Sequence, residues 1–307
     1  MRWRKEGLIY CPDGSQPWAQ AHAMIPTPIM LDRERIRVYF SSTDGGMVGR
    51  VGYVELDAKD PRRILKTAQD PVLGIGEPGM FDDNGVNITS IVRNGDALWL
   101  YYFGYQLGTK VRYFLFGGAA VSNDGGESFE RVQRVPVIDR TQNEPLLRSA
   151  PFVLKEGNRW RMWHVGGDRY IEIDGTTRPT YDLRYLTSDN GIDWGRDSKA
   201  AVSLQGTDEY GLGRPYVLRC AEGYRMWYSI RTHSLGYRLG YAVSSDGVAW
   251  TRRDDVEGME PSGDGWDSDM VCYAAEFETD YGCYLFYNGN EYGRTGFGFA
   301  RLDSGSR

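Results

Sequence analysis

The sequence predicts an all-β fold, a five-bladed β-propeller made of four-stranded antiparallel blades. Three observations support this prediction. A short aromatic strand recurs five times, an apolar strand precedes each copy, and a third strand with small residues follows each copy. Regular repetition of one strand unit is the sequence signature of propellers. Residues 1–307 are therefore expected to form a single domain.

The aromatic strand sets the period of the repeat. Successive copies begin 62, 62, 64 and 59 residues apart, which leaves room for four short strands and their turns. The five copies are Val38–Phe40, Leu100–Tyr102, Met162–His164, Met226–Tyr228 and Leu285–Tyr287.

Each unit is expected to open with a buried strand and a hairpin, because runs of β-branched and aromatic residues bounded by Gly, Asp or Asn indicate strands. The blades are predicted to begin near residues 22, 84, 148, 213 and 269. The opening segments are Ile25–Pro28, Ile88–Val92, Ala150–Val153, Arg214–Val217 and Tyr273–Ala275. The third strands contain Val51–Val54, Gly118–Val121, Leu183–Leu186, Leu239–Ala242 and Phe297–Ala300.

Three of the third strands run into turns that contain aspartate, namely Ser122–Phe129, Thr187–Trp194 and Ser244–Trp250. These turns resemble the Asp-box turns of sialidase-type propellers, in which the aspartate bonds the turn backbone. Such turns lie at the periphery of a blade. We therefore interpret these aspartates as structural.

The N-terminal segment, about residues 2–10, has strand character but no unit of its own. We expect it to supply the outer strand of the last blade. This pairing closes the ring and leaves no exposed edge between the first and last units.

Composition excludes several functions. The formal charge of −6 opposes the phosphate attraction on which nucleic-acid binding depends. No segment approaches the ~18–20 apolar residues that span a bilayer, and the N-terminus lacks the apolar core of a signal peptide. We predict a cytoplasmic protein with no nucleic-acid or membrane partner.

Metal chemistry has little support in the sequence. The four cysteines show no CxxC spacing, and the three histidines are scattered. No cofactor and no metal ligands are predicted. A structural calcium ion in the channel, held by carbonyls and carboxylates, stays an open alternative.

Five titratable residues lie just before the opening strands, at the ends that meet at one mouth of a propeller channel. They are His22, Asp83, Glu144, Glu209 and Asp269. Carboxylates that share a partly dry funnel acquire different pKa values and can divide acid and base roles. We predict Asp83 or Asp269 as base and Glu209 or His22 as proton donor, with Glu144 as a substrate ligand. The alternative is that some of them only cap turns.

Asp82 and Asp267 lie beside two of these candidates. Neighbouring residues on an extended segment point to opposite sides. We therefore expect these two aspartates to be structural.

Arg148, Arg214 and Arg231 stand near strand beginnings in an otherwise acidic protein. A guanidinium fork matches phosphate or carboxylate, so they are predicted to hold an anionic sugar, a sugar phosphate or a sugar nucleotide. The alternative is that they neutralise the rim carboxylates.

Aromatic side chains at the same ends offer flat faces for stacking against sugar rings. His233 follows Arg231 in a predicted loop and is expected to reach the site. The stacking candidates are Trp18, Tyr210, Trp266, Tyr273 and Tyr292.

The chain resembles the superfamily of arabinanases, levansucrases and invertases, which includes glycoside hydrolase families 32, 43, 68 and 117. It looks closest to uncharacterised members found with bacterial surface-glycan and sugar-assembly genes. This resemblance covers nearly the whole chain and implies a sugar-processing propeller, with Asn288 among the substrate ligands. The segments that carry it are Ala21–Ala23, Phe81–Val86, Arg214–Pro215, Trp227–Arg231, Trp266–Asp269, Asn288–Asn290 and Tyr292–Gly298.

The sequence departs from the superfamily at its usual catalytic positions. Characterised hydrolases place an Asp before the Pro of two inner strands and a Glu two residues before a third. The standard triad therefore does not carry over. At the matching positions stand Ile25 before Pro26, Ala150 before Pro151, Ser149 two residues before Pro151, and Arg214 before Pro215.

These features together predict a glycoside hydrolase-like, carbohydrate-active enzyme. It is expected to cleave or transfer a glycosyl group on a small anionic sugar, by carboxylate acid–base catalysis at the channel mouth. Two alternatives stay open, because fold does not fix function. One is a non-catalytic propeller that binds a sugar or a partner, and the other is a non-hydrolytic enzyme of a specialised biosynthetic pathway.

Overall fold

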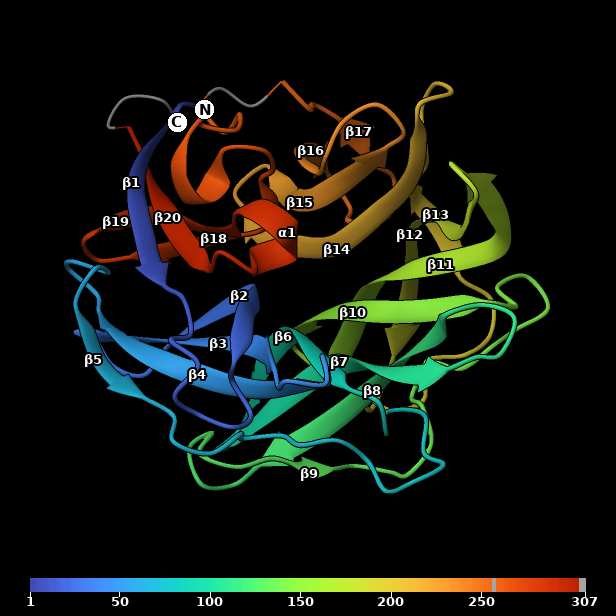
Figure 1. Cartoon of the computed structure of the whole chain (residues 1–307), viewed down its shortest axis with the longest axis horizontal. Helices are drawn as coiled ribbons and strands as arrows, with labels where there is room; N and C mark the ends of the chain where they lie inside the picture. The colour runs from blue at the N-terminus through green and yellow to red at the C-terminus, as the bar shows by residue number, and fades with distance from the viewer. Residues whose placement is uncertain (256–257, 304–307) are drawn as a thin grey trace.

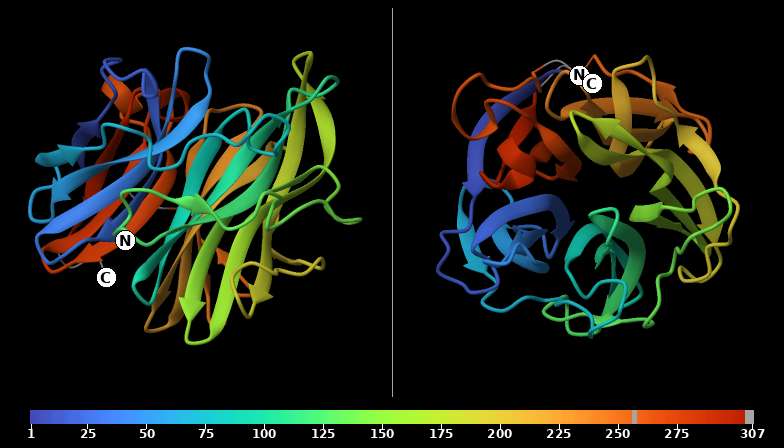
Figure 2. Two further views of the ribbon diagram at one scale, coloured as in Figure 1. Left: turned by 90° about the horizontal axis from the view of Figure 1, so that it is seen from below. Right: turned by 45° about the vertical axis from the view of Figure 1, so that its right-hand side comes forward.

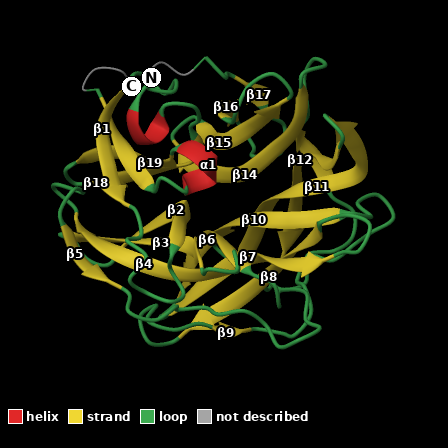
Figure 3. Ribbon diagram, in the orientation of Figure 1, coloured by secondary structure: helices red, strands yellow, loops and turns green. Residues whose placement is uncertain are grey.

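The computed structural model describes residues 1–255 and 258–303, and strands make up nearly all of its regular structure (Figures 1 and 3). The sequence predicts a domain that ends at Arg307, and residues 304–307 lie outside the described part of the chain. The helical segments are η1 (Gly265–Asp267) and α1 (Asn290–Gly293). None of the helices in the described residues is long or apolar enough to span a bilayer.

The strands pair in consecutive groups of four, and each group is antiparallel. We number these groups units 1 to 5. Unit 1 contains β2 (Ala21–Met30), β3 (Arg35–Thr43), β4 (Gly49–Asp57) and β5 (Ile64–Thr67). Unit 2 contains β6 (Val86–Asn94), β7 (Ala97–Leu107), β8 (Tyr113–Ser122) and β9 (Glu130–Arg131). Unit 3 contains β10 (Leu147–Glu156), β11 (Arg159–Ile173), β12 (Thr176–Ser188) and β13 (Lys199–Val202).

The last two units follow the same order, with one difference. Unit 4 contains β14 (Glu209–Cys220), β15 (Gly223–Thr232), β16 (Arg238–Ser244) and β17 (Thr251–Arg252). Unit 5 contains β18 (Cys272–Thr279), β19 (Gly282–Asn288) and β20 (Phe297–Leu302), and its outer strand is β1 (Trp3–Tyr10). The N-terminal strand thus pairs antiparallel with the last strand of the chain, and Figure 1 shows β1 in blue beside the red β20.

The units lie around a common centre, as the right-hand view of Figure 2 shows. Short parallel pairings join unit 2 to unit 3 and unit 3 to unit 4 at the beginnings of β10 and β14. The first strands of these units therefore begin on the same side of the molecule. We call that side the mouth.

Four first strands share one backbone irregularity. The pairing register of each strand shifts next to one residue near its beginning, and that residue has a positive φ. Such bulges re-aim a side chain and cost conformational energy that the surrounding fold must supply. The residues concerned are Ile25 (φ 59°), Ala150 (49°), Arg214 (45°) and Tyr273 (55°).

A buried polar contact fixes the loop before the first strand of unit 2. Asp82 is fully buried and accepts a hydrogen bond from Tyr102 Oη at 2.9 Å. Arg131, on the outer strand β9, donates to the same carboxylate at 2.8 Å. We call this arrangement a carboxylate clamp: a carboxylate near the mouth, a ring on the second strand and a polar group at the outer strand.

Unit 5 repeats the clamp with residues from both ends of the chain. Asp267 accepts hydrogen bonds from Tyr287 Oη at 2.9 Å and from Lys5 Nζ at 2.7 Å. Lys5 lies on β1 and therefore takes the place that Arg131 has in unit 2. Asp82 and Asp267, expected from the sequence to be structural, both belong to clamps.

The small residues of the third strands are explained by the same contacts. A Cβ atom added at Gly118 would overlap the ring of Tyr102, and one at Gly240 would overlap the ring of Tyr228. Glycine at these positions therefore lets the second-strand ring cross the sheet to its carboxylate.

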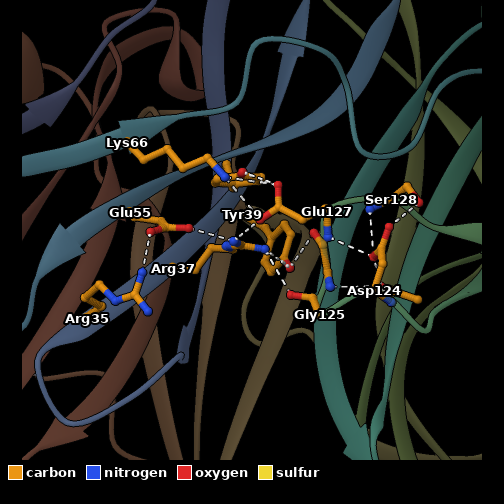
Figure 4. A network of polar contacts seen from close by, with 12 residues as sticks. Arg35, Arg37, Tyr39, Glu55, Lys66, Asp124, Gly125, Glu127 and Ser128 are labelled. Carbon is orange, nitrogen blue, oxygen red and sulfur yellow. Dashed lines mark hydrogen bonds and ion pairs between the residues drawn. The ribbon is translucent and has the colours of Figure 1, made fainter.

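The Asp-containing turns join neighbouring units (Figure 4). Arg37 of β3 donates to Glu127 and to Gly125 O in the turn of unit 2, and Tyr39 Oη donates to Gly126 O at 3.0 Å. Two further second-strand rings donate to the equivalent turn of the next unit, Tyr101 to Gly191 O and Trp163 to Gly247 O, both at 2.9 Å.

Asp124 and Asp246 accept the amides of their own turns, in agreement with the structural interpretation. In the second turn that position is held by Asn190, which accepts the amides of Ile192 and Asp193. Asp189, one residue earlier, is exposed. The amide oxygen of Asn190 can replace a carboxylate at this turn, because one acceptor atom takes both backbone N–H groups.

We predict that Asp267→Asn lowers the free energy of unfolding by about 2–3 kcal/mol, because a charged hydrogen bond to Lys5 and a bond from Tyr287 are weakened. Urea unfolding followed by tryptophan fluorescence measures the loss. Asp264→Asn, at an exposed position close by, is the control. Equal stability of the two variants contradicts the role of the clamp in holding β1.

Candidate functional site

Arg231, near the end of β15, is enclosed by tyrosine side chains at the mouth. Its guanidinium carbon lies 5.3 Å from the ring centroids of Tyr210 and Tyr237 and 5.9 Å from that of Tyr292. Its terminal nitrogens donate to Tyr181 Oη at 3.2 Å and to Tyr292 Oη at 3.3 Å. These tyrosines come from units 3, 4 and 5.

The charge of Arg231 has no acidic partner. No ion pair of its guanidinium is found within residues 1–255 and 258–303. Burial lowers the pKa of Arg231, but the phenols of Tyr181, Tyr237, Tyr210 and Tyr292 outweigh burial and raise it. The group therefore keeps its positive charge inside an uncharged lining.

Further tyrosines extend this lining toward unit 2. The rings of Tyr237 and Tyr273 lie 5.9 Å apart, and those of Tyr105 and Tyr113 lie 5.5 Å apart. Tyr105 and Tyr113 interact electrostatically with both Tyr181 and Arg231. We call the seven rings around Arg231 the tyrosine mouth: Tyr105, Tyr113, Tyr181, Tyr210, Tyr237, Tyr273 and Tyr292.

The phenols of the tyrosine mouth are neutral hydrogen-bonding groups. Burial raises the pKa of Tyr105, Tyr113, Tyr210, Tyr237 and Tyr273. Phenol rings with a free edge present flat apolar faces together with donors and acceptors. This combination suits a polyhydroxylated ring.

Local backbone conformation places several of these rings. Tyr273 occupies the bulge position of β18, and Tyr292 lies in α1 with a φ of 61°. The β11–β12 hairpin reaches the mouth as well, because Tyr170 Oη donates to the main-chain oxygen of Tyr113 at 3.1 Å. The left-hand view of Figure 2 shows the length of this hairpin.

Two polar side chains lie on the unit 1 and unit 2 side of the mouth. Asn87 is 3% exposed, its amide nitrogen lies 3.5 Å from Tyr105 Oη, and its Oδ1 has no partner among the described residues. His22 bonds Thr43 Oγ1 through Nδ1 at 2.9 Å. Burial and the charge of Arg294 lower the pKa of His22, so its ring is neutral at pH 7.

Asp269 lies beside the tyrosine mouth. Its main chain accepts a bond from Arg238 at 3.0 Å and donates to Asn290 Oδ1 at 2.8 Å, next to Tyr292. The side chain is exposed, and no hydrogen bond of its carboxylate is found within the described residues. Its carboxylate is therefore available to a ligand.

Asp83 lies in the loop before β6. Its carboxylate accepts the N–H of Gly79 at 2.8 Å and a bond from Asn84. The loop thus orients Asp83 while the carboxylate keeps further acceptor positions.

Glu209 and Glu144 have other contacts. Both oxygens of Glu209 are held by Arg252, at 2.6 and 2.8 Å, and Arg252 also pairs with Asp254, the partner of Tyr228 Oη. In unit 4 the acid that bonds the second-strand ring is thus Asp254, after the outer strand, and Arg252 links it to Glu209. Glu209 is therefore already bound to an outer-strand arginine.

Glu144 belongs to the clamp of unit 3. It is fully buried and contacts His164 Nε2 at 2.8 Å, Ser198 Oγ at 2.7 Å and Arg148 Nε at 3.2 Å. Burial alone raises the pKa of Glu144, but these hydrogen bonds and the Arg148 charge outweigh burial and lower it. Arg148 neutralises a carboxylate here, which is the alternative that the sequence leaves open.

Arg214 lies deep between units 1, 4 and 5 and is fully buried. It donates to the main-chain oxygens of Ala274 and Pro26, the latter at 2.9 Å, and its guanidinium lies 4.8 Å from the ring of Tyr216. Burial lowers the pKa of Arg214 to about 10. This arginine links first strands through their backbone.

Three remaining candidates divide between core and mouth. Asn288 is fully buried and bonds Ile25 N and Ala23 O, both at 2.7 Å, which joins unit 5 to unit 1. Trp18 is buried against Phe40, the second-strand ring of unit 1, and its indole N–H donates to Gln69 O at 2.9 Å. His233 is exposed, and its ring centroid lies 5.1 Å from that of Tyr210.

The structure therefore brings Arg231, Tyr210, Tyr273, His233 and Asp269 to one part of the mouth. Trp266 packs instead on Tyr287, with ring centroids 5.0 Å apart. No group of three or more His, Cys, Asp or Glu side chains suited to a metal ion is found in residues 1–255 and 258–303.

Sequence reasoning missed Tyr181 and Tyr237, which bond each other at 3.2 Å through their hydroxyls. The signal was present, because each lies two residues before the leucine that begins the third-strand segment of its unit, Leu183 or Leu239. Tyr105 and Tyr113 have no such counterpart in other units. Asn87 likewise shows no pattern in the sequence.

Comparison with known proteins identifies a relative by sequence. The uncharacterized protein Rv1502 of Mycobacterium tuberculosis (strain ATCC 25618 / H37Rv) is 38% identical over 304 residues, which cover 99% of this chain and 100% of that protein. No family model matches the chain.

Solved structures resemble this chain at low identity. A glycoside hydrolase has a TM-score of 0.75 and 17% identity, covering 99% of this chain and 94% of its own. A structure of the GH130 family of mannoside phosphorylases, which contains glycoside hydrolases, has a TM-score of 0.74 and 14% identity, with 98% and 93% covered. A thermostable family-43 glycoside hydrolase gives 0.66 and 13%, with 94% and 93% covered. The fold is that of the propeller-type glycoside hydrolases, which confirms the expected resemblance.

We predict that Glu144→Gln destabilises the protein at pH 7 by about 3–5 kcal/mol, because Arg148 loses its buried counter-charge. The folded pKa of Glu144 lies below the ordinary value of 4.5, so its ionisation stabilises the fold above that pH. This stabilisation is lost as the pH falls through the folded pKa. Urea unfolding at pH 7 and at pH 3.5 measures the difference between variant and wild type.

That difference is expected to shrink at the lower pH. Glu172→Gln, at an exposed position on β11, controls for the general effect of removing a carboxylate. A difference that stays constant across this range contradicts an ionised, stabilising Glu144.

Proposed function

Since this chain belongs to the family of the uncharacterized Mycobacterium tuberculosis protein Rv1502 and has the fold of glycoside hydrolases, we propose that it is a carbohydrate-active enzyme whose active site is the tyrosine mouth. In this proposal units 1 to 5 are the blades of one five-bladed propeller, and β1 completes the last blade. The pairing of β1 with β20 and the Lys5–Asp267 clamp support that arrangement.

The charge of Arg231 without an acidic partner is the observation that carries the proposal. A half-buried guanidinium among neutral phenols costs solvation energy that a bound anion recovers. Within the described part of the chain, the terminal nitrogens bond tyrosine hydroxyls, which a ligand oxygen can replace. The substrate is therefore a sugar with a phosphate or carboxylate group, held by Arg231 as counter-ion.

The rings around Arg231 supply the sugar-binding surface. Tyr210, Tyr237 and Tyr292 present faces near the guanidinium, and stacked aromatic faces bind the apolar side of a sugar ring. The hydroxyl of Tyr181 and the unpartnered Oδ1 of Asn87 offer directed hydrogen bonds. Such polar groups fix the orientation of a ligand in an aromatic pocket.

Acid–base catalysis in this proposal falls to Asp269, with Asp83 and His22 as the other rim groups. Asp269 lies next to the tyrosine mouth and its carboxylate is available, so it acts as the base that takes the proton of the attacking water or acceptor hydroxyl. His22 is neutral, so it takes up a proton at Nε2 before it donates one to the leaving oxygen. Glu209 has no part here, because Arg252 occupies both of its oxygens.

A second candidate function is non-catalytic binding of an anionic sugar. The bulge positions where characterised hydrolases of this fold carry acids hold Ile25, Ala150 and Arg214 in this chain. A propeller with the tyrosine mouth but no working acid–base pair is a sugar-binding module. Binding and turnover measured separately distinguish the two functions.

We predict that Arg231→Gln weakens binding of anionic sugars at least about tenfold, since one charged hydrogen-bond pair is lost. Thermal shift and isothermal titration with glucose 1-phosphate, mannose 1-phosphate and glucuronic acid measure the loss. A ligand that binds only the folded protein raises its melting temperature in the wild type. Arg253→Gln, exposed in the same unit, is the control and is expected to bind as the wild type does. Equal binding by both variants contradicts the role of Arg231.

We predict that Asp269→Asn lowers kcat of an identified glycoside substrate by about 100-fold or more while it retains binding, because a positioned acid or base contributes about 10²–10⁴ in rate. Asp280→Asn, exposed in the β18–β19 turn, is the control. Full turnover by both Asp269→Asn and Asp83→Asn removes the catalytic assignment. Wild type that binds sugars but turns over none of their conjugates establishes the binding module.

A further inference from the structure

A groove of about 710 Å³ lies in unit 2 and in the loop that leads from it to unit 3. It begins beside the tyrosine mouth, because Gln106, one of its lining residues, follows Tyr105 on β7. One wall is the loop before β6, and the other is the segment between β9 and β10. Its lining includes Met80, Phe81, Gln106, Phe116, Pro136 and Arg140.

Arg140 is an exposed cation in this groove, and its guanidinium lies against two phenylalanine rings. Its guanidinium carbon lies 4.5 Å from the ring centroid of Phe114 and 5.0 Å from that of Phe116. No hydrogen bond or ion pair of this guanidinium is found in the described part of the chain. The second arginine of the groove, Arg134, is paired with Glu77.

A stacked arginine of this kind has two free binding elements. Its outer face can take a planar ring, and its N–H edge matches two phosphate oxygens. Met80, on the facing loop, and Val135 and Pro136, on the same segment as Arg140, add apolar surface to the groove, and Val135 is 62% exposed. A flat ring that enters the groove therefore meets an apolar surface and a cation together.

The groove and the tyrosine mouth adjoin. Tyr170 interacts electrostatically with both Arg140 and Tyr113, and Tyr113 belongs to the tyrosine mouth. The wall residue Gly79 donates its N–H to Asp83, a rim carboxylate of the proposed active site. One extended ligand can thus occupy both places.

We propose that this groove is a nucleotide-binding site and that the substrate class of the enzyme is a sugar nucleotide. The base and ribose lie along Met80, Val135 and Pro136 and against the outer face of Arg140, whose N–H edge binds the phosphates. The sugar part extends to the tyrosine mouth. The assignment of the sugar rests on the proposed function, whereas nucleotide binding in the groove stands on Arg140 and its lining alone.

Isothermal titration with UDP tests the groove without any turnover. Wild type is expected to bind UDP with a Kd below 1 mM, and Arg140→Gln is expected to bind at least tenfold more weakly. Arg159→Gln, at the exposed beginning of β11 and outside the groove lining, is the control and is expected to change the Kd less than twofold. Circular dichroism and melting temperature verify that both variants remain folded.

Pyrophosphate and uridine separate the two halves of the ligand. Each is expected to bind at least tenfold more weakly than UDP. No UDP binding up to 5 mM, an Arg140→Gln variant that binds as the wild type does, or pyrophosphate that binds as tightly as UDP overturns the nucleotide site. Arg231→Gln is expected to keep UDP binding, so loss of the sugar site and loss of the nucleotide site give different results.

Discussion

The carboxylate clamp is the interaction on which the arrangement of the mouth depends. In units 2, 3 and 5 a buried carboxylate just before the first strand bonds the second-strand ring residue and a polar group at the outer strand, as Asp82 does with Tyr102 and Arg131. Each clamp ties the innermost loop to the outermost strand of its unit, so the loops at the mouth cannot move independently. A buried charge pair is strongly destabilising to break, so each clamp favours one position of the loop. In unit 5 the outer strand is β1, and the same clamp holds the N-terminus through Lys5.

A rigid frame explains how the protein tolerates a cation without a counter-ion at the mouth. Arg214 and Arg231 are both enclosed, but their environments differ. The terminal nitrogens of Arg214 are bonded to backbone oxygens of units 1 and 5. Within the described residues, the guanidinium of Arg231 has contacts with phenol hydroxyls and rings and no acidic partner. The solvation energy that Arg231 loses on folding can be recovered when an anion binds. Such an unfavourable group persists where the surrounding structure holds it in place.

The fold was largely predictable, and the site was predictable only in part. The second-strand rings recur at a regular spacing and so locate every unit, and β1 is recognisable as a strand without a unit of its own. The position of an acid along the chain does not show whether a cation of the fold binds its carboxylate. Glu209 and Asp269 stand at similar offsets before their strands, yet Arg252 binds the first, and the second is exposed. That difference depends on Arg252, 43 residues away on another strand. The site residues Tyr105 and Asn87 come together only through the packing of neighbouring units.

The clamps also separate the acids that support the fold from those that are open to chemistry. Glu144, Glu209, Asp82 and Asp267 each form an ion pair with an arginine or a lysine, so their carboxylates are bound within the fold. Asp269 has no such partner in the described chain and lies next to the rings around Arg231. The fold pairs its structural acids, whereas within the described residues Asp269 and Arg231 have no oppositely charged partner and are open to a ligand at the same mouth. The proposed site therefore rests on these charges and not on the usual catalytic positions of the superfamily, where this chain carries Ile25, Ala150, Ser149 and Arg214.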